Sequence, residues 1–303
     1  MRSPFFFAAT LCAVAVLSPT LGCHGTTGST AVTSDAGRAT FPVRGKIVAI
    51  RGSVITLDHE AVPGFMDAMT MPYKLKDPSI VSELHPGDRI TATILVRKDA
   101  DGFSDPQLDQ IVVIAQARPD YKPTVQYHMP KQGDLVPDFA LLNQSDHTIH
   151  LDQFHGRLLL TTFIYTRCTV ADFCPRMSRN FATIDEQLRK DPKLYAATHL
   201  LSVSFDPGYD TPQVLRSYGG AYTGRFTNET FGHWDFAAPP QKELNSMAEW
   251  FGVGIQPGPN GTLNHSVSTA LIGKDGRILA WFPTNEWTPD QMLAAIHKAA
   301  PRA

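Results

Sequence analysis

The chain has 303 residues, enough for about two domains, and 43% of them are hydrophobic, so each domain can bury a core. The formal net charge of −2 provides no excess of basic residues for nucleic acid or another polyanion, which argues against a nucleic-acid partner. The sequence also has no glycine-rich phosphate loop and no serine or carboxylate pair in a recognisable catalytic setting, which argues against nucleotide-binding and hydrolase classes.

Residues 1–22 have the pattern of a signal peptide. Arg2 precedes the apolar run FFFAATLCAVAVL, and a small residue, Gly22, stands directly before Cys23. We expect cleavage at this point, lipidation of Cys23 and attachment to the membrane on the periplasmic side, with plain secretion as the alternative. Residues 23–40 are rich in Gly, Ser and Thr, a composition that predicts a flexible tether.

Short alternating apolar runs fill residues 41–117. Examples are SVITLDH and ITATILV, and turn signals such as HPGD separate the runs. This spacing predicts a small all-β domain, an OB-like barrel of about five strands. Residues 118–131 contain three prolines and are predicted to be a semi-rigid linker.

The pattern changes to alternating strands and helices in residues 132–303. The run HGRLLLTTFIYT predicts a buried strand, and the segment beginning at Cys174 and Pro175 predicts a helix. A second helix is predicted in DTPQVLRSYGG, starting at Asp210 or Thr211 and ending at its glycines, and Asp206 is predicted to be a turn residue at its entry. The histidines of HTIHLDQFH are expected in a solvated turn and helix entry. This order of elements favours an α/β thioredoxin-like fold.

Two cysteines remain once the signal segment and the lipidation site are set aside. They are Cys168 and Cys174, separated by five residues. A loop this short constrains the unfolded chain little, so a purely structural disulfide is a weak explanation. Cys174 falls at a predicted helix start, where the macrodipole favours a thiolate, and Arg167 and Arg176 add positive charge nearby. The pair can serve as a redox couple, or as two metal ligands with His265 as a third.

Four segments resemble, in order and spacing, the SCO/SenC family of copper-binding thioredoxin-like proteins. They are GDLVPDFALLNQ, TTFIYTRCTVADFCPRMS, SVSFDPGYDTPQVLRSY and NHSVSTALIGKDGRIL. The resemblance implies copper bound by Cys168, Cys174 and His265, in a protein that helps assemble the dinuclear copper centre of cytochrome c oxidase. The copper-bearing oxidase subunit is then a partner, and a thiol–disulfide reductant protein is another. The family's usual spacer is C-x-x-x-C, whereas this chain has two further residues between its cysteines.

The segment LDHEAVPGFMDAMTMPY concentrates soft donors. In a strand, Met69 and Met71 point to the same face, and His59 and Met66 lie nearby in the sequence. Such methionines are usually core fillers, which is the alternative here. As ligands, thioethers select Cu(I) or Ag(I) and exclude most divalent metals.

Residues 41–116 resemble the periplasmic copper chaperones of the CusF type. The resemblance implies His59, Met69 and Met71 as ligands, and Met66 takes roughly the place of the tryptophan that covers the metal in that family. The two resemblances together predict an extracytoplasmic copper chaperone that binds Cu(I) and Cu(II). Thiol–disulfide oxidoreductase or peroxidase-like activity of Cys168 and Cys174, and sequestration of copper or silver for tolerance, remain as alternatives.

Overall fold

The computed structural model describes most of the chain beyond its N-terminal segment. The described residues are 38–99, 102–120, 127–169, 171, 173–257, 261–285 and 287–300. The predicted signal peptide, the lipidation site Cys23 and most of the predicted tether lie outside them. Among the residues described, no helix is long and apolar enough to cross a membrane.

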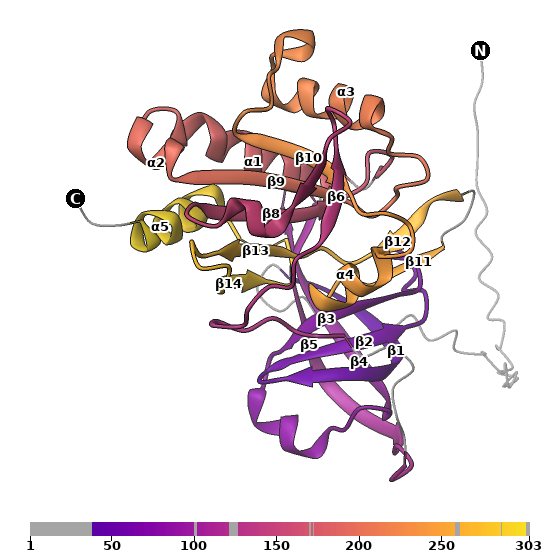
Figure 1. The fold of residues 1–303 in the computed structure, drawn as a ribbon. Helices are drawn as coiled ribbons and strands as arrows, with labels where there is room; N and C mark the ends of the chain where they lie inside the picture. Colours follow the sequence, from indigo (N-terminus) through magenta and orange to yellow (C-terminus); the bar gives the residue numbers. More distant parts are fainter. Residues whose placement is uncertain are drawn as a thin grey trace, which may run out of the picture. The chain divides into compact units, whose positions relative to one another are not determined.

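The N-terminal strands form a closed five-stranded barrel, as predicted (Figure 1). Their bounds are β1 (Arg38–Arg51), β2 (Val54–His59), β3 (Met69–Leu75), β4 (Arg89–Asp99) and β5 (Gly102–Ala115), with a 3-10 turn at Pro78–Glu83. The order is β1-β2-β3-β5-β4, in which β3 and β5 pair in parallel and the other described pairs are antiparallel. Apolar side chains such as Ile47, Ile55 and Leu57 are fully buried and fill the interior.

The second part of the chain contains a seven-stranded sheet of order β14-β13-β8-β9-β10-β6-β7. The strands are β6 (Ala140–Asn143), β7 (Thr148–His150), β8 (Leu158–Ile164), β9 (Thr198–Ser204), β10 (Trp234–Ala238), β13 (Thr269–Ile272) and β14 (Ile278–Phe282). Every residue of β8 and β9 is buried, as expected for parallel strands covered on both faces. A separate hairpin is made by β11 (Ile255–Pro257) and β12 (Leu263–His265).

Helices cover this sheet. They are α1 (Cys174–Leu188), α2 (Pro192–Ala196), α3 (Pro212–Thr223), α4 (Leu244–Trp250) and α5 (Pro289–Ala299), with 3-10 turns at Leu151–Phe154 and Phe226–Asn228. Helix α1 packs against β8, β9 and α5, and Figure 1 shows α3 and α4 on opposite sides of the strands. Strand, helix, strand, helix, hairpin and helix follow in the predicted thioredoxin-like order.

The structure corrects two local predictions. Helix α3 does not end at Gly219 and Gly220 but continues to Thr223, and the left-handed residue that ends it is Gly224, with φ of 69°. Gly219 is needed for packing instead, because a Cβ there would lie 2.6 Å from the ring of Phe236. The segment HTIHLDQFH forms strand β7 and a 3-10 turn, rather than a turn and helix entry alone.

Candidate metal centres

Cys168, Cys174 and His265 come together at one end of the sheet. Cys168 lies in the loop after β8, Cys174 is the first residue of α1, and His265 is the last residue of β12. The two sulfur atoms and one ring nitrogen lie within 4.8 Å of one another. Both cysteines lie within the described residues, and no disulfide joins them. His265 is buried, at 2% exposure, at the end of the short strand β12.

The ring of His265 is oriented by its own backbone. Its Nδ1 lies 2.9 Å from the carbonyl oxygen of Ser266, and a carbonyl can only accept, so Nδ1 carries the proton. The lone pair of a neutral ring is therefore on Nε2, which lies 3.6 Å from Cys168 Sγ and 3.5 Å from Cys174 Sγ. A backbone carbonyl that fixes the tautomer in this way is the usual support of a metal-binding histidine.

The two thiols have different electrostatics. The hydrogen bond with the Cys174 thiol, and then the neighbouring His265, lower the pKa of Cys168 to about 4. Burial raises the pKa of Cys174, which is fully enclosed. The predicted contribution of Arg167 is indirect, because its guanidinium donates to Asp206 Oδ2 at 2.6 Å and stacks on Tyr209. The pKa of Cys168 is thus held below the ordinary value of a thiol, while that of Cys174 is held above it.

Three aromatic side chains that the sequence did not single out support this centre, and two of them, Phe205 and Tyr165, are buried. Phe205, Tyr165 and Phe173 surround the imidazole of His265, with ring centroids 4.6, 5.3 and 5.5 Å away. Two of them flank the cysteines in FIYTRCTVADFCPRM, a signal that could have been used. The shell excludes water from most of the ring and limits its movement.

Asp210 also has a role that the sequence did not reveal. It is buried and accepts hydrogen bonds from the backbone N–H and hydroxyl of Thr166, at 3.0 and 2.5 Å, and from Ser204 Oγ at 2.5 Å. Thr166 stands two residues before Cys168, and Ser204 ends β9, so Asp210 fixes the cysteine loop to the sheet. Thr211, and not Asp210, is the N-cap of α3. Asp206 is the neighbouring turn residue, as predicted, and it holds Arg167.

The second group of candidate ligands lies in the barrel. His59 is directly opposite Met69 across β2 and β3, and Leu57 is opposite Met71, so all four side chains share the interior face. His59, Met69 and Met71 are almost fully buried. Met66 lies in the preceding turn, half-buried, and accepts a hydrogen bond from the buried hydroxyl of Tyr73 at 3.5 Å.

His59 has the same tautomer as His265. Its Nδ1 lies 2.7 Å from the carbonyl oxygen of Glu60, so its lone pair is on Nε2. This Nε2 is buried and has no hydrogen-bond partner. Burial lowers the pKa of His59, which keeps the ring neutral. A buried acceptor without a partner costs stability, and a soft metal among these thioethers would satisfy it.

Comparison with known proteins matches the two parts of the chain to two different family models. A family model described as SCO1/SenC matches residues 128–301, and one described as "Copper binding periplasmic protein CusF" matches residues 40–104. The SCO1 protein homolog of Bacillus subtilis is 27% identical over 54% of this chain and 82% of its own length. A SCO2-like protein of Rickettsia felis is 28% identical over 48% of this chain and 67% of its own length.

Among solved structures, Arabidopsis thaliana ScoI with copper bound matches 55% of this chain and 98% of its own, with 16% identity and a TM-score of 0.47. Both resemblances predicted from the sequence are confirmed by the two family models, and copper is confirmed as the metal at the level of the families. The SCO1/SenC model covers more than half of the residues of this chain, and the chain therefore belongs to the SCO1/SenC family.

Proposed function

We propose that this chain is an extracytoplasmic copper chaperone, tethered to the membrane at Cys23, that aids maturation of the dinuclear copper centre of cytochrome c oxidase. Membership of the SCO1/SenC family supports the delivery role, and the CusF match supports a second copper site and a periplasmic location. The copper-bearing oxidase subunit is the proposed client, and a thiol–disulfide reductant protein would keep the cysteines reduced.

One observation carries the proposal for the larger domain. Nε2 of His265 faces the sulfur atoms of Cys168 and Cys174 at about equal distances, 3.6 and 3.5 Å, although 97 and 91 residues separate them from it in sequence. Two thiolates and one imidazole are the soft and borderline donors that suit Cu(I) and also hold Cu(II). A redox pair alone has no need of a histidine whose tautomer is fixed toward both sulfurs.

In the barrel, we propose His59, Met69 and Met71 as ligands, with Met66 as a fourth donor or cover. The support is the cross-strand pairing of His59 with Met69 and the buried Nε2 without a partner. Neutral thioethers bind Cu(I) without losing a proton and cannot form disulfides, which suits an oxidising compartment.

The test is anaerobic titration of the reduced chain with Cu(I), followed by metal analysis. Two bound equivalents are expected for the wild type and about one tight equivalent for His265→Ala. His297→Ala is the control, because His297 lies in the last turn of α5. An unchanged Cu(I) affinity in the His265→Ala chain would contradict the proposed centre.

A second candidate function is thiol–disulfide exchange, which the lowered pKa of Cys168 favours. The two functions respond differently to one substitution. If exchange is the main activity, His265→Ala should leave the rate of disulfide exchange with a small dithiol nearly intact. If copper delivery is the main activity, the main effect of the same substitution should be a loss of Cu(I) affinity. Sequestration for tolerance would instead require that deleting the barrel sensitises cells to copper while oxidase assembly continues.

A further inference from the structure

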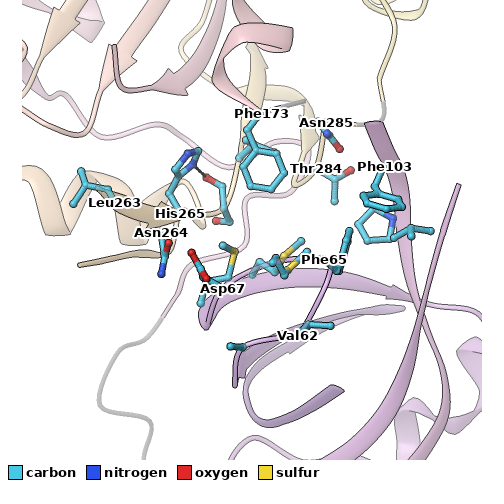
Figure 2. Close-up of a pocket in the computed structure, with 18 of the residues that line it drawn as sticks. Val62, Phe65, Asp67, Phe103, Phe173, Leu263, Asn264, His265, Thr284 and Asn285 are labelled. Carbon is cyan, nitrogen blue, oxygen red and sulfur yellow. Dashed lines mark hydrogen bonds between the residues drawn. The ribbon is translucent and has the colours of Figure 1, made fainter. Parts of the chain in front are cut away.

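Donors from both proposed copper sites line one cavity. Its volume is about 600 Å3, and Met66, Met69 and Met71 contribute to its wall together with His265, Tyr165 and Phe173. Figure 2 shows Phe65, Asp67 and Phe103 on one side of this space and His265 and Phe173 on the other. Neither Cys168 nor Cys174 lines it. His265 is therefore the member of the thiolate centre that the cavity reaches.

Hydrogen bonds fasten the strand of methionines to the hairpin that carries His265. Gln256 in β11 donates to Thr70 Oγ1 at 3.0 Å, and Asn264 in β12 donates to the carbonyl oxygen of Ala68 at 3.1 Å. Thr70 lies between Met69 and Met71, and Asn264 directly precedes His265. We call these two contacts, Gln256–Thr70 and Asn264–Ala68, the clamp.

A glycine permits the close approach at the clamp. A Cβ on Gly254 would lie 2.3 Å from the carbonyl oxygen of Thr70, closer than the non-bonded contacts that real Cβ atoms make. Gly254 also donates its N–H to Ser266 Oγ at 2.9 Å, next to the carbonyl that orients His265. The position of the methionine strand is thus tied to the residues that fix the imidazole.

We propose that Cu(I) passes directly from the thioether site to the thiolate site within one chain, through this cavity. The inference rests on the proposed function, because it requires that both sites bind copper. Within the thiolate centre, His265 is the first ligand to bind the arriving copper ion. Within the barrel, Met66 is the last ligand to release it. Met66 suits that role because it lies in a turn, half-buried, whereas Met69 and Met71 are fixed in β3.

The step is ligand exchange without electron transfer. Copper stays Cu(I), its bonds to thioether sulfur and to His59 break, and bonds to His265, Cys168 and Cys174 form. Each cysteine that carries a proton releases it to solvent as its sulfur binds copper. Two thiolates bind Cu(I) more tightly than neutral thioethers do, so transfer runs from the barrel to the cysteines. Holding donor and acceptor in one chain makes the rate independent of protein concentration.

The experiment follows Cu(I) arrival at the cysteines by thiolate-to-copper absorption in the ultraviolet, after rapid mixing of the reduced full chain with a Cu(I) chelate. In the wild type we expect a first-order phase whose rate does not change over about a tenfold range of protein concentration. Gln256→Ala with Asn264→Ala removes the clamp and should slow this phase about tenfold. Gln241→Ala with Asn245→Ala, two exposed positions, is the matched control. Gly254→Ala is a second way to disrupt the contact between β3 and the β11–β12 hairpin.

Two outcomes would overturn the inference: a clamp variant that is folded and transfers at the wild-type rate, or a wild-type rate proportional to protein concentration. Failure of the proposed function is detected by a separate measurement, made first on two variants that each keep one proposed copper site. Cys168→Ser with Cys174→Ser keeps only the barrel site, and Met69→Leu with Met71→Leu keeps only the thiolate centre. If either chain takes up no Cu(I), the site assignment is wrong. If both do, the transfer measurement tests the route alone.

Discussion

The barrel and the thioredoxin-like domain orient their candidate metal-binding histidines in the same way and surround them with different sulfur chemistry. In each, Nδ1 donates to the carbonyl of the next residue, Glu60 or Ser266, and Nε2 is left for a metal. The barrel then offers thioethers, which stay neutral at every pH. The larger domain offers thiols, which bind more tightly as thiolates and can be oxidised. The backbone fixes the imidazole, and the type of sulfur sets affinity and redox sensitivity.

The largest expected effect is a loss of Cu(I) affinity at one of the two centres, with none at the other. Cys174→Ser removes a buried sulfur ligand, so the Cu(I) affinity of the thiolate centre should fall more than about 100-fold while the barrel keeps its copper. Competition with a Cu(I) chelator measures both. Loss of copper from both sites together would show that the centres are not independent.

The reciprocal change tests the barrel. Met69→Leu with Met71→Leu replaces the thioethers with side chains of similar volume, so each should change the free energy of unfolding by less than about 1.5 kcal/mol. The Cu(I) stoichiometry should nevertheless fall by one. Met292→Leu, in the core of the larger domain, is the control for replacing a buried methionine. If the stoichiometry is unchanged, these methionines are only core residues.

A smaller effect is expected at Asp210, which positions the cysteine loop and contacts no metal. Asp210→Asn places an amide where Thr166 and Ser204 need an acceptor, and the Cu(I) affinity of the thiolate centre should fall about tenfold. The absorption spectrum of the copper-bound thiolates should shift as their geometry loosens. Thr166→Ser keeps the hydroxyl donor and should behave as the wild type, and an unaltered spectrum in Asp210→Asn would argue against positioning.

The smallest effect concerns His199, whose two ring nitrogens both have partners. Its Nδ1 faces Arg157 at 3.3 Å, its Nε2 lies 2.9 Å from Asp235, and His233 is the nearest other titratable ring. Burial lowers its pKa from 6.5, so the folded form keeps it neutral and the unfolded form protonates first. Stability from this residue is present above pH 6.5 and is lost as the pH falls.

We therefore expect the melting temperature of the metal-free chain to drop by roughly 2–4 °C between pH 7.5 and 5.5 through this residue. The drop should be smaller in His199→Phe, or in His199→Gln if the former does not fold. The same pH dependence in wild type and variants would assign the effect elsewhere.

The two centres also differ in how far sequence could predict them. The barrel ligands depend on local pairing, since His59 and Met69 are brought together by a turn between adjacent strands, and period-2 alternation shows their common face. The helix that begins at Cys174 could likewise be predicted from its own segment of sequence. His265 was harder, because only the packing of the β11–β12 hairpin brings it to the cysteines. Tyr165 and Phe173 flank the cysteines in the sequence, whereas Phe205 and Asp210 follow no spacing rule, and only the three-dimensional structure places them beside the centre.

The close contact between Gly254 and the backbone of Thr70 has a practical consequence for experiments on the isolated domains. Expressing residues of the larger domain by themselves would deprive Gln256 and Asn264 of their acceptors and uncover the side of the hairpin that orients the imidazole. Affinities measured on such a fragment would describe a looser acceptor than the one in the intact chain.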